Sequence, residues 1–149
     1  MVPINAPVQI VQTATIDRRP TEIEIRISVL INRLKTVESG NNPNIIGDNG
    51  RAWGILQITA QMVSEINRMS DTDFTQLDAF DPIKAEEMAR LYFEFIDSIV
   101  VRERHRHAYG KEFAFAWNGG TDAWTRVEHP KHDKKQKNLE GYWGACKVL

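Results

Sequence analysis

Glu38 is the side chain of this sequence best placed to act as an acid. It falls at the C-terminal end of an expected helix, directly after Val37, and Ser39-Gly40 follow it. Apolar neighbours and the negative end of a helix dipole both disfavour a charged carboxylate, so they raise its pKa. A carboxylic acid of raised pKa can protonate the leaving oxygen of a glycosidic bond. Taken alone, however, a glutamate near a helix end is most often a solvated surface residue.

Two later segments carry amide side chains in glycine-rich surroundings. The first is Trp53-Gly54-Ile55-Leu56-Gln57-Ile58, and the second is Ala116-Trp117-Asn118-Gly119-Gly120. Both amides can donate and accept hydrogen bonds, which suits the binding of a polar ligand. Plainer interpretations exist for each of them. Gln57 can be an ordinary surface amide, and Asn118 can be a helix-ending residue in the left-handed conformation.

The order of these motifs resembles the lysozyme-like superfamily, and more narrowly the soluble lytic transglycosylases and goose-type lysozymes. The resemblance rests on Glu38-Ser39, the Gly-x-x-Gln-Ile segment and the aromatic-Asn-Gly turn, and it covers roughly residues 25–149. It implies an enzyme that cuts the β-1,4 bond between N-acetylmuramic acid and N-acetylglucosamine in peptidoglycan, with Glu38 as general acid. It also implies an α+β, mostly α-helical, lysozyme-like fold with a small β-hairpin beside the active-site cleft.

The resemblance also implies contacts with the glycan strand. Gly54 lets backbone approach a sugar, and Gln57 bonds an N-acetyl group or the acid. Asn118 holds the 2-acetamido group of the substrate. Ser39 either caps local backbone or touches substrate, and we favour the structural role.

Aromatic side chains complete the expected substrate-binding residues. Trp53, beside Gly54, is the best candidate for stacking on a sugar ring. Trp117 replaces the tyrosine that the family usually has before its asparagine. Tyr142 resembles the C-terminal tyrosine that hydrogen-bonds the acid in transglycosylases, although the family's Glu-Thr-x-x-Tyr pattern is absent before it. A buried structural tyrosine is the alternative for Tyr142.

A second carboxylate decides between hydrolysis and transglycosylation. Asp48 lies where goose-type lysozymes carry an aspartate, so it could be a catalytic residue that orients an attacking water. Ala52 stands in place of the c-type lysozyme aspartate, and Thr59 replaces another goose-type aspartate. Transglycosylases lack a water-activating base, and the sugar's own 6-hydroxyl attacks to give a 1,6-anhydro end. Asp48-Asn49-Gly50 is also favourable turn sequence, so both roles stay open.

Composition excludes several classes of partner. The chain has 149 residues, of which 42% are hydrophobic and 26% charged, and its formal net charge is −1. This balance gives no bias toward nucleic acid or a membrane surface. No segment approaches the roughly 20 apolar residues of a membrane helix, and residues 1–20 lack the features of a signal peptide. A cytoplasmically made wall enzyme then needs release by lysis, a phage virion or a secretion machine.

No cofactor or metal is expected. His105 and His107 are two residues apart on an expected helix and point away from each other, and Pro130 places His129 and His132 in a loop. Cys146 is the sole cysteine and is interpreted as a small buried hydrophobe. The basic run between residues 131 and 137 is either a solvated loop or a contact with anionic wall polymer.

Apolar spacing predicts the elements that carry these residues. Residues 1–19 are expected to form an N-terminal arm or edge strand, and residues 20–149 the catalytic domain. Pro20 is expected in the first turn of a helix. A hairpin is expected around residues 48–50, and Thr59 and Asp81 are expected to cap the starts of two further helices. The later expected elements are a core helix from Pro82 to about residues 102–107, a short helix over 113–117, a turn capped by Thr121, a polar loop over 128–137 and a final helix from Tyr142.

Two rival functions are also compatible with the sequence. A lysozyme-like module without turnover, structural or peptidoglycan-binding, could serve for example in a phage virion. Chitin or another N-acetylglucosamine polymer is a further substrate, because acetamido contacts are shared by both polymers.

Overall fold

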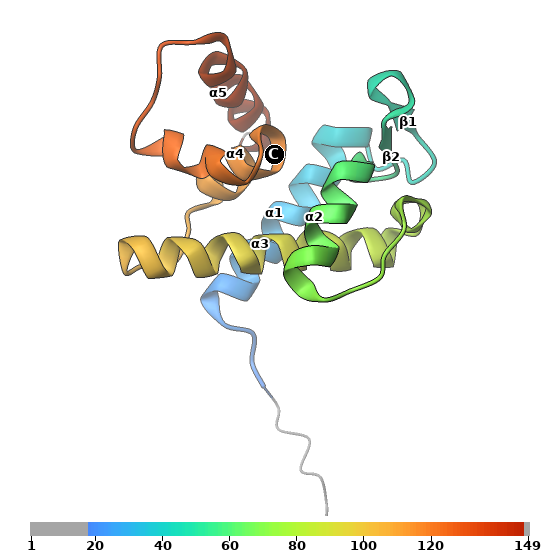
Figure 1. Cartoon of the computed structure of the whole chain (residues 1–149), viewed down its shortest axis with the longest axis horizontal. Helices are drawn as coiled ribbons and strands as arrows, with labels where there is room; N and C mark the ends of the chain where they lie inside the picture. Colours follow the sequence, from blue (N-terminus) through green and yellow to red (C-terminus); the bar gives the residue numbers. More distant parts are fainter. Residues whose placement is uncertain (1–17, 148–149) are drawn as a thin grey trace, which may run out of the picture.

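Helices make up most of the chain, as expected. The computed structural model describes residues 18–147, and its elements follow one another as Figure 1 shows. The α-helices are α1 (Glu22–Ser39), α2 (Ala60–Ser70), α3 (Pro82–Arg104), α4 (Gly110–Gly119) and α5 (Lys134–Lys147). The 3-10 helices are η1 (Asp48–Gly50), η2 (Gln76–Phe80) and η3 (Thr121–Val127), and the strands are β1 (Ile46–Gly47), β2 (Ala52–Trp53) and β3 (Ile58–Thr59). The prediction of a mostly helical α+β fold with a small hairpin is confirmed.

Helix α1 carries the expected acid at its end. Thr21 caps its start, since the Thr21 hydroxyl accepts from the Glu24 amide and the Glu24 carboxylate accepts from the Thr21 amide. Pro20 therefore lies just before the cap and not in the first turn, which corrects the expected start. Gly40 ends the helix with φ 62°, a left-handed conformation that glycine adopts without steric cost.

The hairpin forms around residues 48–50, as predicted, and belongs to a three-stranded antiparallel sheet in the order β1-β2-β3. Ile46 pairs with Trp53, and Ala52 pairs with Thr59. Strand β3 runs directly into α2, because the Thr59 hydroxyl accepts from the Met62 amide at 3.2 Å and caps that helix. The sheet thus joins the region after α1 to the start of α2.

Helix α3 is the long core helix. Asp81 caps it by accepting from the Ile83 amide at 2.9 Å, and Pro82 occupies the first position, as expected. Phe93 and Val100 are fully buried, while Phe95 and Ile99 are only partly buried. The eight buried residues of α3 follow helical spacing: Ala85, Met88, Ala89, Tyr92, Phe93, Ile96, Asp97 and Val100.

The C-terminal region differs most from expectation. Helix α5 begins at Lys134 rather than at Tyr142, because the Asp133 carboxylate accepts from the Gln136 amide at 2.7 Å and Leu139 is buried. The first turns of α5 carry mainly polar side chains, so they show no apolar spacing from which the sequence could predict a helix. Thr121 does not cap the turn after α4, since Gly120 takes the cap position of η3.

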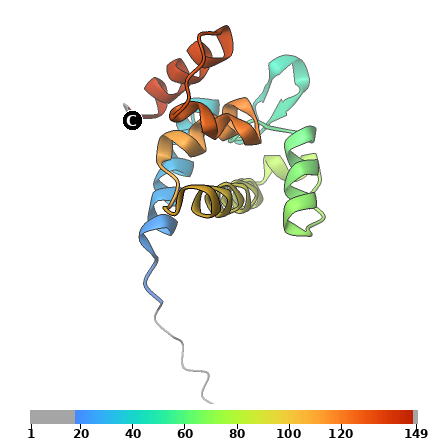
Figure 2. The same ribbon diagram turned by 60° about the vertical axis from the view of Figure 1, so that its left-hand side comes forward.

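Two groups of elements face each other. In Figure 1, α4, η3 and α5 lie on one side and α2 and the sheet on the other, with α1 between them and α3 running beneath both groups; Figure 2 shows the same arrangement from another side. Helix α1 contacts α3, α4 and α5. The predicted division into a 1–19 arm and a 20–149 domain stays a prediction, because residues 1–17 lie outside the described part of the chain.

None of the helices in the described range combines the length and apolar character needed to cross a membrane.

Candidate active site

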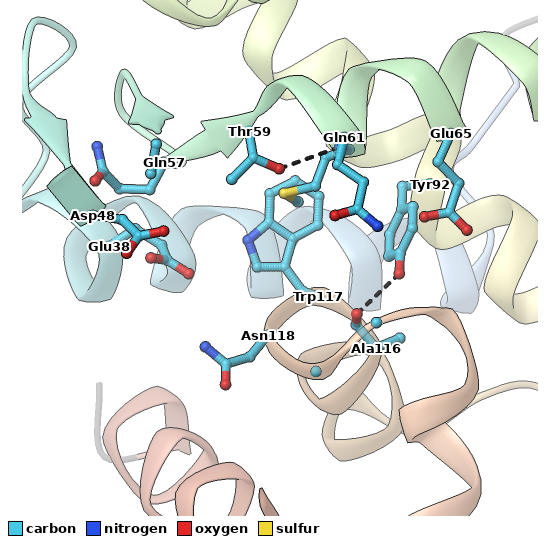
Figure 3. Close-up of a pocket in the computed structure, with 14 residues that line it drawn as sticks. Glu38, Asp48, Gln57, Thr59, Gln61, Glu65, Tyr92, Ala116, Trp117 and Asn118 are labelled. Atoms are coloured by element: carbon cyan, nitrogen blue, oxygen red, sulfur yellow. Dashed lines mark hydrogen bonds between the residues drawn. The ribbon is translucent and has the colours of Figure 1, made fainter. Parts of the chain in front are cut away.

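A cavity of about 490 Å³ lies between the two groups of elements. Its walls come from the end of α1, the sheet, the first turns of α2, α3 and the C-terminal half of α4. Figure 3 shows the side chains that face it, with Glu38 and Asp48 on one side of the view and Glu65 on the other. The lining residues are Glu38, Asp48, Ala52, Gln57, Thr59, Gln61, Met62, Glu65, Tyr92, Ala116, Trp117, Asn118, Gly119 and Gly120.

Glu38 is held at the cavity wall by a residue from the other end of the chain. The Tyr142 hydroxyl in α5 donates to Glu38 Oε1 at 2.5 Å, so the two side chains join α1 to α5. Burial raises the pKa of the Glu38 carboxyl above its ordinary value, and hydrogen bonds from Tyr142 and Trp117 lower it by less. The raised pKa of Glu38 thus arises mainly from desolvation.

Tyr142 acts here as a hydrogen-bond donor. Burial, followed by the nearby Glu38 charge, raises the pKa of Tyr142 far above its usual range, so its proton stays on the phenol. Trp117 is buried and packs edge-on against Tyr92 with ring centroids 5.5 Å apart, which fixes its ring at the cavity wall. The structure therefore brings two of the predicted aromatic residues to the acid.

Asp48 reaches the cavity from the hairpin turn. Its backbone has φ 49°, and its side chain is 54% exposed and pairs with Arg51 at 3.0 Å. Because Asp48 lines the same cavity as Glu38, the second carboxylate is available to the site. Asp48 therefore forms part of the hairpin turn and also lines the cavity.

Gln57 and Asn118 both line the cavity, as the motifs suggested. Gln57 has φ 52°, and its amide nitrogen donates to the Gly54 carbonyl at 3.0 Å. A side chain at Gly47 would meet the Gln57 amide oxygen at 2.2 Å, so that glycine makes room for Gln57. Asn118 lies within α4 without a positive φ, which contradicts its alternative interpretation as a left-handed helix end.

Ser39 and Gly54 have structural contacts and do not line the cavity. The Ser39 hydroxyl donates to the Ile55 carbonyl at 2.8 Å and ties the end of α1 to the sheet region. Gly54 has φ 79°, and a Cβ there would lie 1.9 Å from the Ala79 carbonyl oxygen. Close packing against η2 therefore requires this glycine.

Trp53 also lies outside the cavity lining. Its ring stacks on Phe80 at a centroid distance of 5.2 Å and an interplanar angle of 22°. Its indole N–H donates to the Gly50 carbonyl at 2.7 Å. One face of Trp53 is thereby occupied by Phe80, so the ring packs the hairpin against η2.

Glu65 belongs to none of the sequence motifs, yet it is half-buried in the cavity wall. The Thr121 hydroxyl donates to Glu65 Oε1, and this contact links α2 to the turn after α4. Tyr92 donates to the Ala116 carbonyl at 2.9 Å, and burial raises its pKa to about 12. Helical spacing after the Thr59 cap was the available signal for Glu65, because it places Gln61 and Glu65 on one face.

The cavity is acidic along its length. Its lining includes three carboxylates, from Glu38, Asp48 and Glu65, and no lysine, arginine or histidine. Within residues 18–147, no group of three or more His, Cys, Asp and Glu side chains is arranged to hold a metal ion. The site therefore offers acid groups and amides to its ligand.

One known protein family matches most of this chain. The family model of the transglycosylase SLT domain matches residues 26–140, a range that includes Glu38, Gln57 and Asn118 and ends before Tyr142. Searches of curated proteins and of solved structures gave no significant match. The motifs that resembled soluble lytic transglycosylases thus lie inside a match that spans most of the chain. The chain belongs to the transglycosylase SLT domain family, and its general function is that of a peptidoglycan-degrading, lytic-transglycosylase-like protein.

Proposed function

We propose that this protein cleaves the β-1,4 bond between N-acetylmuramic acid and N-acetylglucosamine, with Glu38 as its general acid. The observation that carries the proposal is the Glu38 carboxyl, desolvated at the wall of a cavity and hydrogen-bonded by Tyr142. Burial keeps the carboxyl protonated to higher pH than a solvated glutamate, which is the state that proton donation requires.

The proposed reaction uses Glu38 twice. First, its proton moves to the glycosidic oxygen, the bond from that oxygen to C1 of the muramic acid breaks, and positive charge develops at C1. The Glu38 carboxylate then takes the proton of the same sugar's 6-hydroxyl as that oxygen bonds to C1. A 1,6-anhydro end forms, and Glu38 is protonated again. Tyr142 stabilises the intermediate carboxylate by donating its hydrogen bond.

Other cavity residues would orient the sugar. The amides of Gln57 and Asn118 lie in the same lining as Glu38 and can bond an acetamido group. Trp117 presents a fixed aromatic surface beside the acid. Well-placed groups of this kind hold the scissile bond near the proton donor.

Hydrolysis is the second candidate, and one observation favours it. Asp48 lines the cavity together with Glu38, so it could orient an attacking water in place of the 6-hydroxyl. Two other observations support the transglycosylase route. The Asp48 carboxylate is exposed and is paired with Arg51, so it is already engaged by a partner other than an attacking water. The two routes leave different products.

Mass spectrometry of soluble fragments from purified peptidoglycan tests the proposal. We expect muropeptides that end in 1,6-anhydromuramic acid, and no release by Glu38→Gln, which keeps the shape of the side chain but lacks the proton. Glu94→Gln is the matched control, because Glu94 is an exposed glutamate of α3 outside the cavity lining. Fragments heavier by one water, together with their loss in Asp48→Asn, would instead establish the hydrolase.

Three other outcomes would overturn parts of the proposal. Release by Glu38→Gln at the wild-type rate would remove Glu38 as the acid. Binding of the wild-type protein to peptidoglycan without any soluble fragment would favour the binding or structural module. Equal release from chitin would move the substrate class away from muramic acid polymers.

A further inference from the structure

A second hollow continues from the acidic cavity. It has a volume of about 270 Å³ and shares Gly119 and Gly120 with the cavity, so the two meet at these glycines. The hollow lies between the α4–η3 turn and the start of α5. Its full lining is Gly119, Gly120, Thr121, Asp122, Ala123, Thr125, Arg126, Lys131 and Lys135.

The two glycines that line both spaces have different surroundings. A Cβ at Gly119 would lie 2.8 Å from Leu139 Cδ2 and 3.3 Å from Lys135 Cε, so this glycine allows α5 to pack closely. Gly120 has φ 97°, and a Cβ there would meet no atom within 4 Å. The side of Gly120 on which a Cβ would stand is therefore open, whereas that of Gly119 is filled.

The charges of the two spaces are opposite. The cavity lining carries three carboxylates and no basic side chain, whereas the hollow is lined by Arg126, Lys131 and Lys135 with Asp122 as its one acid. Arg126 is paired with Asp133 at 2.9 Å and is only 13% exposed, so much of its charge is neutralised locally. Lys131 and Lys135 are exposed. These two lysines give the hollow its positive character.

We propose that Lys131 and Lys135 bind the carboxylates of the stem peptide carried by the muramic acid whose bond is cut. This inference rests on the proposed function. The peptide branches from the lactyl group of that sugar, so it must leave the acidic cavity, and its carboxylates are repelled by the carboxylates of Asp48 and Glu65. The open side of Gly120 gives the peptide room to pass toward the hollow, and the lysines supply charge of the opposite sign there.

The neighbouring lysines provide a matched comparison. Lys134 and Lys137 line a different hollow, which shares no residue with the acidic cavity and only Lys131 with the basic hollow. They belong to the same basic run of sequence and are also exposed. Removing their charges changes the net charge by the same amount and leaves the proposed peptide path intact.

The test compares intact sacculi that carry no covalently attached phosphate polymers with the same glycan strands stripped of peptides by an amidase. The measured quantity is kcat/KM on intact sacculi divided by kcat/KM on stripped strands. We expect the double variant Lys131→Gln/Lys135→Gln to lower this ratio about three- to tenfold, since each exposed ion pair contributes little. Lys134→Gln/Lys137→Gln should leave the ratio unchanged. Added salt should reduce the wild-type ratio toward that of the first variant.

Binding measurements keep the inference separate from catalysis. In a Glu38→Gln background, the affinity for a soluble disaccharide-peptide and for the peptide-free disaccharide is measured by calorimetry. A loss confined to the peptide-bearing ligand in Lys131→Gln/Lys135→Gln supports the inference, even if the wild-type protein releases no fragments and the proposed function fails. An unchanged ratio and unchanged affinities would show that Lys131 and Lys135 belong to a solvated loop that binds no peptide, and would overturn the inference. Equal losses with both substrates, or with both double variants, would overturn the peptide assignment.

Discussion

Two opposing influences set the acidity of Glu38. Burial raises the pKa of its carboxyl, and the hydrogen bond from Tyr142 lowers it. A proton donor that must also take its proton back benefits from a pKa near the working pH, because both steps then stay accessible. In the proposed reaction, Tyr142 is thus a positioning residue that tunes the pKa of Glu38.

The first prediction concerns Tyr142→Phe. Removing the hydroxyl removes a donor to the carboxylate, so the pKa of Glu38 rises further above its ordinary value. The alkaline limb of the pH profile of kcat/KM, where Glu38 loses its proton, should therefore move to higher pH. Its position is measured by the release of soluble muropeptides across pH. Tyr109→Phe, at an exposed tyrosine outside the cavity, should leave the limb in place. An unmoved or lowered limb in Tyr142→Phe would contradict this tuning.

At the scale of elements, the connection between β2 and β3 depends on close backbone packing. Gly54 approaches η2 so tightly that the Ala79 carbonyl occupies the space where a Cβ would be. Strand β2 and η2 also meet through the stacked rings of Trp53 and Phe80. This packing supports the wall that carries Gln57 into the cavity.

The second prediction is that Gly54→Ala destabilises the protein by about 2–4 kcal/mol, because it adds both left-handed strain and a steric clash. Denaturant unfolding measures the change. Gly141→Ala is the control, since Gly141 lies on an exposed face of α5 with no atom within 4 Å of a Cβ. We expect it to increase stability by about 0.5–1 kcal/mol. A similar effect of both substitutions would show that the Ala79 contact does not constrain the fold.

A buried ion pair holds α4 in place. Glu112 is fully buried in the first turn of α4, and its carboxylate accepts from the Arg106 guanidinium at 2.7 Å and from the Tyr109 amide at 2.8 Å. Arg106 also pairs with the more exposed Glu128. These contacts fix the start of the helix whose other end carries Trp117 and Asn118.

The third prediction separates the two partners of Arg106. Glu112→Gln should destabilise the protein by about 3 kcal/mol, since it leaves a partly buried guanidinium without its main counter-charge. Glu128→Gln removes an exposed partner and should cause a much smaller loss. Thermal unfolding at neutral pH compares the variants. Equal losses of stability in the two variants would mean that the burial of Glu112 does not strengthen its ion pair with Arg106.

At the scale of the whole molecule, the buried acid reduces stability. The cavity is assembled from α1, the sheet, α2, α3 and α4, and α5 covers Glu38 through Tyr142. A carboxyl whose pKa is raised by folding is charged at a free-energy cost once the pH exceeds that pKa. If Glu38 is the general acid that we propose, function and stability conflict at this residue.

The fourth prediction follows from the sign of this shift. The folded state holds the Glu38 proton more tightly than the unfolded state, whose ordinary pKa is 4.5. Wild-type stability is therefore lost as pH rises from 4.5 through the raised pKa, and Glu38→Gln should not show this loss. The variant should gain in free energy of unfolding across that window and keep the gain at about pH 7. Urea unfolding at several pH values measures it, with Glu94→Gln as control. A variant less stable than wild type at neutral pH would contradict the desolvation argument.

Local patterns in the sequence determined much of this protein. Apolar spacing and caps at Thr59 and Asp81 predicted three of the helices, and Asp48-Asn49-Gly50 predicted the hairpin turn. The order of Glu38, Gln57 and Asn118 indicated the family and predicted that these residues line one cavity. Each of these motifs is short, and its backbone geometry depends on near neighbours, so it can be recognised in the sequence. The start of α5 escaped prediction, since polar residues fill its first turns.

Only the tertiary structure decided how distant residues meet. It brought Tyr142 to Glu38 across 104 residues, added Glu65 to the cavity and assigned Trp53 and Gly54 to packing against η2. It also placed the basic hollow next to the acidic cavity, with Gly119 and Gly120 lining both. These contacts depend on how α2, α4 and α5 pack around α1 and α3, and no local spacing in the sequence encodes that packing.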